Sequence, residues 1–302
     1  MESMHWRHQR FVVTFLLAVF SHVIARAEEP VAGTDRNVDL QLRMWVDAYT
    51  KIAAQHDFRL AEDHETPLDR QPKALQVYSH PSGLEGTHGA FYVWTRMGRP
   101  EVVGSIWSYE SKGDRRTIVH EFDSLATTPL AEIQIAKGTW KQRRTIAPEL
   151  VRDAPLPAAL PRARLSQMKE IAHGFEGYSM TNKTEIQLRM LPRPLYQFQS
   201  GEGAVRDAAL FCFFADWDPE IVLLIESRST ESGDRWYYSA ARFNVCPMWL
   251  NYHDNQVWRV DREPNTEFTF GDPEGPFFAV HEVGASPRAI KPEKASEPAV
   301  ER

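Results

Sequence analysis

A short segment, Val119-His120-Glu121-Phe122-Asp123, holds the residues whose types and spacing best suit chemistry. Read as a β-strand, it places Glu121 and Asp123 on one face and His120 on the other, because side chains alternate along a strand. Two carboxylates at this spacing can share a divalent cation or shift one another's pKa. The alternative, which we favour, is a solvated face on which both acids lie opposite arginines of neighbouring strands.

A tryptophan in an expected turn, Asp216-Trp217-Asp218-Pro219, is the second candidate. An exposed indole between two carboxylates could stack on a sugar or on a cationic ligand. Turn tryptophans also fold back over the edge of their own sheet, and we favour that structural role. Trp217 is therefore a candidate ligand-binding residue with a plain structural alternative.

The short motifs of common enzymes are absent from the sequence. It has no nucleophile elbow, no His-Glu-x-x-His, no P-loop, no Cys-x-x-Cys, no dinucleotide fingerprint and no haem-attachment motif. We therefore expect no cofactor and no metal, and favour a non-catalytic binding or interaction domain. The alternative is a hydrolase that uses Glu121 and Asp123, with a divalent metal and with His120 or His88 nearby.

The N-terminus has the order of a secretory signal peptide. Basic Arg7 and Arg10 precede an apolar stretch from 11 to 25, and Ala25 and Ala27 are small residues at the positions that a signal peptidase reads. The stretch is shorter than the roughly 20 residues that span a bilayer, which favours cleavage over anchoring. We predict cleavage after Ala27, export to the periplasm or the extracellular space, and a soluble mature protein.

The net charge bears on the classes of partner, and the two cysteines bear on whether a disulfide forms. The formal net charge is −6 at pH 7 and no stretch is dense in lysine and arginine, so we expect neither nucleic acid nor an anionic membrane as partner. The expected partner is an unknown protein or envelope ligand.

Cys212 and Cys246 could form a disulfide in an exported protein, but Cys246 would have to fold back to reach Cys212. Two buried free thiols are the alternative that we favour.

The elements that would position these residues occur twice along the chain. In each half a helical stripe of apolar residues, the first from about 34 to 56, precedes two apolar runs separated by a proline-containing turn. The runs 210–214 and 221–225 are continuous, which is typical of strands covered on both faces. The matching order favours duplication over the independent use of similar hairpins.

We therefore predict an α+β fold, a duplicated unit of one helix plus an antiparallel β-meander, with the two units sharing a core. The connector between the units is rich in proline and alanine, and the C-terminal tail has almost no large apolar residue. The expected segments are a signal peptide (1–27), a flexible N-terminus (28–36), a first αβ unit (37–146), the connector (147–162), a second αβ unit with extra C-terminal strands (163–284) and a disordered tail (285–302).

Several segments also carry a resemblance. They are Asp153-Ala154-Pro155-Leu156-Pro157-Ala158, Arg164-Leu165-Ser166-Gln167-Met168, Leu191-Pro192-x-Pro194-Leu195-Tyr196, Asp218-Pro219-Glu220 and His120-Glu121-Phe122-x-Ser124-Leu125. In these segments, which span most of the mature chain, the sequence resembles a family of uncharacterised exported bacterial proteins found in large paralogous sets. The resemblance implies export. It implies no activity, cofactor, partner or functional residue, because none is established for that family.

Overall fold

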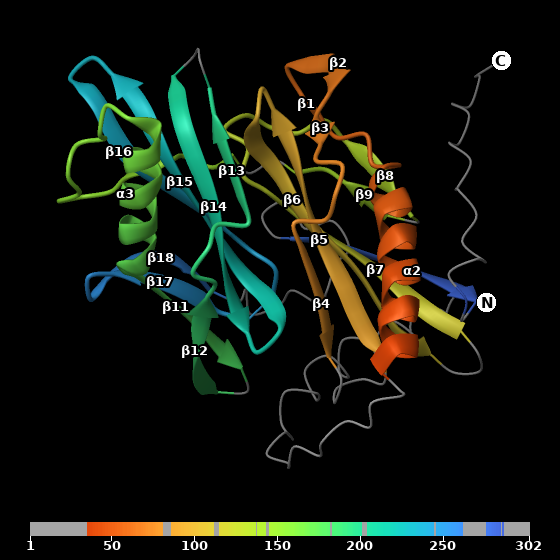
Figure 1. Cartoon of the computed structure of the whole chain (residues 1–302). Coiled ribbons are helices and arrows are strands. Elements are labelled where there is room, and N and C mark those ends of the chain that lie inside the picture. The colour runs from red at the N-terminus through yellow and green to blue at the C-terminus, as the bar shows by residue number, and fades with distance from the viewer. Residues whose placement is uncertain are drawn as a thin grey trace.

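The protein consists mainly of two antiparallel β-sheets that face each other, with a helix on the outer side of each (Figure 1). The expected signal peptide, its cleavage site at Ala27 and nearly all of the expected C-terminal tail lie outside the described residues. The structure, a computed structural model, describes residues 35–80, 86–111, 115–136, 138–142, 145–181, 183–200, 204–244, 246–261, 276–284 and 286.

The six-stranded sheet comes mostly from the first half of the chain. Its strand order is β19-β7-β6-β5-β3, and β4 also pairs with β5. The last strand in the sequence, which we expected in the second unit, pairs with β7 so that Phe277 lies opposite Phe122. The strands are β3 (Asp69–Arg70), β4 (Gln76–His80), β5 (Thr87–Arg96), β6 (Arg99–Ser111), β7 (Arg115–Ser124) and β19 (Phe277–Gly284).

The nine-stranded sheet has the order β10-β16-β15-β14-β12-β11-β17-β18, and β13 pairs with β14. Its first edge strand, β10, lies in the segment that the sequence assigned to the connector. The strands are β10 (Glu149–Leu150), β11 (Phe175–Thr181), β12 (Thr184–Met190), β13 (Tyr196–Gln199), β14 (Val205–Ala215), β15 (Asp218–Thr230), β16 (Gly233–Arg242), β17 (Met248–Tyr252) and β18 (Asn255–Val260). Two small hairpins complete the described strands, β1 (Arg59–Leu60) with β2 (Asp63–Pro67), and β8 (Ile133–Ile135) with β9 (Gly138–Trp140).

Each helix buries one apolar stripe on the outer face of its sheet. The expected first helix is confirmed as α2 (Asp35–Ala53), whose Trp45, Tyr49 and Ile52 pack into the core of the six-stranded sheet. Their steps of four and three place them on one side of the helix. The second helix, α3 (Pro161–His173), starts at a proline, which suits the first turn because its missing N–H has no partner there.

The inner faces of the two sheets pack on each other along a surface that we call the seam. Alternation along β15 explains the continuous apolar run of the sequence. Ile221 and Leu223 belong to the core under α3, while Val222 and Leu224 belong to the core between the sheets. Across the seam these residues meet a cluster from the other sheet that includes Phe91, Val93 and Val103.

The predicted α+β fold, a duplicated unit of one helix plus an antiparallel meander, is wrong. The described part of the protein is mostly β, with two helices among its many strands, and its two antiparallel sheets are curled. Local periodicity did not identify the strands of 175–199 as members of the second sheet, because they lack a long apolar run. Nor could periodicity show that β19 crosses to the first sheet, because strand pairing depends on contacts distant in sequence.

Candidate functional site

Strand β7 presents the predicted residues on its two faces, as the period of a strand requires. Glu121 and Asp123 point into the seam, whereas His120 and Phe122 point toward α2 and the segment that follows it. The solvated acidic face that the sequence favoured is not what forms, because the second sheet covers it. Glu121 is 5% exposed and Asp123 is fully buried.

Asp123 has a structural role within the seam. Its Oδ1 accepts a hydrogen bond from the backbone N–H of Ser124 at 2.8 Å, and its Oδ2 accepts one from the backbone N–H of Arg242 at 3.1 Å. The second bond joins β7 to β16 across the seam. Because both oxygens already hold backbone donors, Asp123 is poorly placed to act as a general base beside Glu121.

Glu121 instead lies near Asp218 and Glu220 of β15, and we call these three residues the acidic cluster. Burial, together with the neighbouring charges of Asp218 and Glu220, raises the pKa of Glu121 well above its usual value. Burial raises the pKa of Asp218 to about 7, and burial with the charge of Asp218 raises that of Glu220 well above normal. None of the ion pairs in the described part of the chain includes a member of the cluster.

Three aromatic side chains, Tyr78, Trp107 and Trp217, adjoin the acidic cluster and form what we call the aromatic wall. Trp217, half-buried in the turn between β14 and β15, packs on Tyr78 with 5.7 Å between ring centroids. It also meets His80 edge to face at 4.6 Å. The ring therefore reaches across to the other sheet, rather than folding over its own sheet as the sequence favoured.

A glycine gives the wall its close packing. Tyr78 crosses β5 at Gly89, where an added Cβ would lie 2.5 Å from both Tyr78 Cζ and Trp107 Cβ. The Tyr78 hydroxyl thereby reaches the hydroxyl of Ser105, the residue opposite Glu121 on the neighbouring strand. Glu121 also forms a hydrogen bond with the Trp107 side chain, and this bond opposes the rise of the Glu121 pKa. The wall and the cluster are thus one contiguous group.

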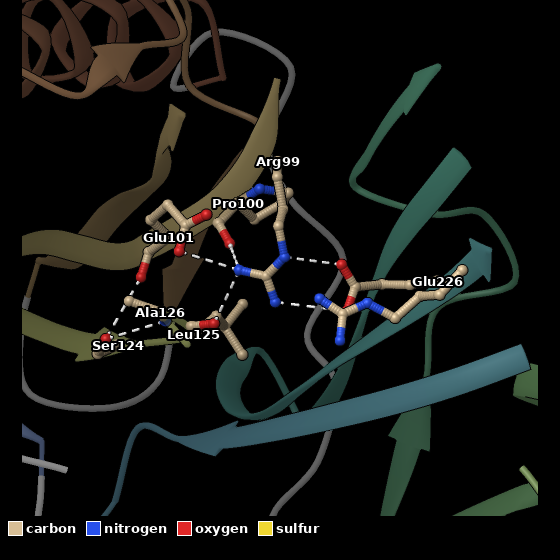
Figure 2. Close-up of polar contacts among 8 residues, drawn as sticks. Arg99, Pro100, Glu101, Ser124, Leu125, Ala126 and Glu226 are labelled. Atoms are coloured by element: carbon tan, nitrogen blue, oxygen red, sulfur yellow. Dashed lines mark hydrogen bonds and ion pairs between the residues drawn. The ribbon is translucent and has the colours of Figure 1, made fainter. Parts of the chain in front are cut away.

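The opposite end of the seam carries a different arrangement, the Arg99 network of Arg99, Glu101 and Glu226 (Figure 2). Arg99 Nε donates to Glu226 Oε1 across the seam at 2.7 Å, and Nη2 donates to Glu226 Oε2 at 3.3 Å. Its Nη1 donates to Glu101 Oε2 at 2.9 Å and to the Leu125 carbonyl at 3.0 Å. Burial still raises the pKa of Glu101 to about 7, although Arg99 opposes the rise.

His120 belongs to a chain of three histidines on the other face of β7. His56 Nε2 lies 3.2 Å from His120 Nδ1, and His120 Nε2 lies 3.0 Å from His281 Nδ1. Burial lowers the pKa of His56 to about 3 and that of His120 well below normal, so both rings are neutral. His88 also faces α2, where its Nδ1 lies 2.7 Å from the Tyr49 hydroxyl. Neither histidine of the hydrolase hypothesis therefore adjoins Glu121.

Cys212 and Cys246 are both buried, and no disulfide joins them. Cys212 packs in the seam, and Cys246 lies 3.9 Å from the Thr181 hydroxyl.

Within the described ranges, no group of three or more His, Cys, Asp or Glu side chains is arranged to hold a metal ion. Neither described helix has the length and apolar character that crossing a membrane requires.

Sequence reasoning missed Asp218 and Glu220, although a signal was present. Both precede the apolar run that starts at Ile221, and they alternate in phase with Val222 and Leu224. Had that run been extended backward, its period would have placed both acids on the face of β15 that the second sheet covers.

Comparison with known proteins finds no match to this chain, whether among protein-family models, curated proteins or solved structures.

Proposed function

We propose that the protein is an exported, non-catalytic binding domain whose ligand site is the acidic cluster together with the aromatic wall. The observation that carries the proposal is the juxtaposition of carboxyl groups without ion-pair partners and a half-buried tryptophan at one end of the seam. Trp217 and Asp218 are both partly exposed, so the group meets solvent on their side. Aromatic faces beside a few convergent polar groups are typical of ligand sites.

The hydrolase that would use Glu121 and Asp123 has less support. Asp123 accepts two backbone hydrogen bonds, and His120 and His88 lie on the opposite face of the sheet. A general acid–base pair needs both groups within reach of one substrate, and this arrangement supplies only Glu121. A raised pKa is found at binding sites as well as in general acid catalysts, so it does not favour the hydrolase.

Export is proposed on the N-terminal sequence, in which Arg7 and Arg10 precede the apolar stretch and Ala25 and Ala27 end it. We expect the secreted chain to begin at Glu28. N-terminal sequencing of the protein recovered from the producing cells measures this directly. A chain that still begins at Met1 would contradict cleavage and export by this route.

The binding role is tested by capture from envelope extract with two variants of the mature chain. Trp217→Ala removes the partly exposed ring of the wall and should abolish capture of a specific component that the wild type retains. Trp249→Ala is the matched control, because Trp249 stacks on Tyr178 at 5.5 Å, outside the aromatic wall. Retention of the same component by Trp217→Ala, with native circular dichroism in both variants, would argue against this site.

A further inference from the structure

We infer that the acidic cluster receives a cationic group of its ligand, an ammonium or guanidinium. The inference rests on the binding function proposed above and specifies the chemistry of that same site. Three observations carry it: the charges around the cluster, a buried oxygen without a partner, and the aromatic rings beside it.

The charges that act most on the cluster are all negative. Glu121 is affected by Asp218, Glu220 and Asp123, and Glu220 by Asp218. The Arg99 network, in the same seam, places a guanidinium between two such carboxylates. The acidic cluster has the carboxylates but no described ion pair, so an arriving cation would supply the charge that Arg99 supplies at the other end.

A buried oxygen of Glu220 provides a second, independent indication. The Glu220 side chain is 1% exposed, and its Oε1 accepts a hydrogen bond from Asn244 Nδ2 at 3.3 Å. Its Oε2 is buried and has no hydrogen-bond partner. Buried polar atoms in folded proteins nearly always have partners, so this oxygen indicates a position for an external N–H donor. Ammonium and guanidinium groups carry several such donors.

The aromatic wall suits a cation because the faces of aromatic rings attract positive charge. Trp217 and Tyr78 lie beside the acids, and burial together with the nearby charges of Asp218 and Glu121 raises the pKa of the Tyr78 hydroxyl. The protein uses the same contact elsewhere, since the Arg116 guanidinium lies 5.1 Å from the ring centre of Trp45. The acids are not arranged with other described residues to hold a metal ion, which favours an organic cation.

Binding of such a cation requires ionised acids, so it should depend on pH. Rising pH ionises the cluster and should strengthen binding, until the change is complete above the pKa values of its members. Among the described residues, the titratable groups around the site are Tyr78 and His80 on β4, Glu121 and Asp123 on β7, Cys212 on β14, and Asp218 and Glu220 on β15, and Arg242 on β16 contacts Asp123 through its backbone N–H.

The experiment titrates the full mature chain with n-butylguanidinium and with its neutral isostere n-butylurea, read by tryptophan fluorescence and by indole N–H resonances. We expect n-butylguanidinium to shift the Trp217 and Trp107 signals, with binding at least tenfold weaker at pH 5 than at pH 8. We expect n-butylurea to produce no saturable shift. Equal responses to the two probes, or no response to n-butylguanidinium at either pH, would overturn the inference.

Variants identify the acids. Glu220→Gln and Asp218→Asn keep the shape but remove the charge, and each should weaken n-butylguanidinium binding at least tenfold while raising the melting temperature. Glu282→Gln is the control, because Glu282 is an exposed partner of Arg115 on β19. Unchanged affinity in both cluster variants would overturn the inference.

The envelope capture separates this inference from the proposed function. Capture that requires Trp217 but is unaffected by Glu220→Gln would leave the binding domain standing and reject a cationic ligand. Capture that is unaffected by either change would reject both the site and the cation. Loss of capture in both variants, with the control unchanged, is the result that we expect.

Discussion

The two ends of the seam bury acidic side chains to similar depth, but in the described part of the chain these acids form ion pairs at one end and not at the other. Glu226 and Glu220 lie six residues apart on the inner face of β15, and both are almost completely buried. Arg99 reaches Glu226 from the other sheet, whereas no described residue forms an ion pair with Glu220. The Arg99 network joins the two sheets through ion pairs, whereas the acidic cluster is the site for which we propose ligand binding.

The comparison also separates two electrostatic regimes. A buried ion pair is costly to break because the remaining charge is left in a medium of low polarity. In a buried group of acids without a cation, burial and mutual repulsion raise the pKa of the members, so they keep their protons to higher pH. Stability at the first end should depend on the partner arginine, and stability at the second end should depend on pH.

The largest effect is expected for Arg99→Ala. The change leaves Glu101 and Glu226 buried without the guanidinium, and should lower the free energy of unfolding by about 3–5 kcal/mol. Urea denaturation followed by circular dichroism measures the loss. Arg59→Ala is the control, because Arg59 pairs with Asp57 on the surface, where solvent screens the charges, and the change should leave stability nearly unchanged. A cost as small for Arg99 would remove the contrast between the two ends.

The second prediction concerns pH and Asp218. Burial raises the pKa of Asp218 from its ordinary value of 3.8, which applies to the unfolded chain, to about 7 in the folded protein. At a pH between these two pKa values, folding is therefore coupled to the uptake of a proton. The contribution of Asp218 to stability is therefore present at low pH and is lost as pH rises through about 7, at up to about 1.4 kcal/mol per pH unit.

Comparison of the wild type with Asp218→Asn isolates this effect. Glu101 and the neutral buried histidines His56 and His120 also titrate, and the histidines destabilise the fold as pH falls. Subtraction removes these shared contributions and leaves that of Asp218 together with its coupling to Glu121 and Glu220. We expect the stability of the wild type relative to Asp218→Asn to fall from pH 4 to pH 7 and then level off. A flat difference would contradict the raised pKa.

A smaller gain is expected for Glu121→Gln at pH 8. The amide keeps the size of the side chain and removes one of the mutually repelling acids, so the free energy of unfolding should rise by about 1 kcal/mol. Thermal unfolding at pH 8 measures the gain. A loss of stability would show that a charged Glu121 is stabilised in the fold, which would contradict the destabilising effect that we assign to its burial beside Asp218 and Glu220.

The smallest effect is expected on the outer edge of the six-stranded sheet. Glu282→Gln removes the ion pair with Arg115, both of whose side chains are about half exposed, so its effect should stay below about 0.5 kcal/mol. The same unfolding assay applies. A larger loss would mean that β19 depends on this pair for its place beside β7, and would weaken Glu282→Gln as a control.

Part of the fold could be predicted from local pattern. The helix expected from about 34 to 56 is present as α2, and the apolar runs at 210–214 and 221–225 form strands covered on both faces. The α+β class and its duplicated unit were wrong, because the strands β10 and β19 join sheets that their position in the sequence does not indicate. The expected signal peptide and cleavage at Ala27 stay predictions.

The candidate site shows the same division. Spacing within one strand correctly separated Glu121 and Asp123 from His120, but it paired Glu121 with Asp123, which holds backbone donors instead. The acids that accompany Glu121 come from a strand almost a hundred residues later. No local spacing could reveal that grouping, because it depends on which sheet faces β7.

The sequence by itself determined which side chains share a face, since alternation along a strand follows from the geometry of the local backbone. Only the tertiary structure decided what covers each face. The second sheet turned an expected solvated face into a buried seam, brought Asp218 and Glu220 to Glu121, and placed Arg99 beside Glu226. The pKa of a buried acid depends on its burial and on the charges near it in the fold, which can come from residues distant in sequence. Both depend on how the sheets pack against each other.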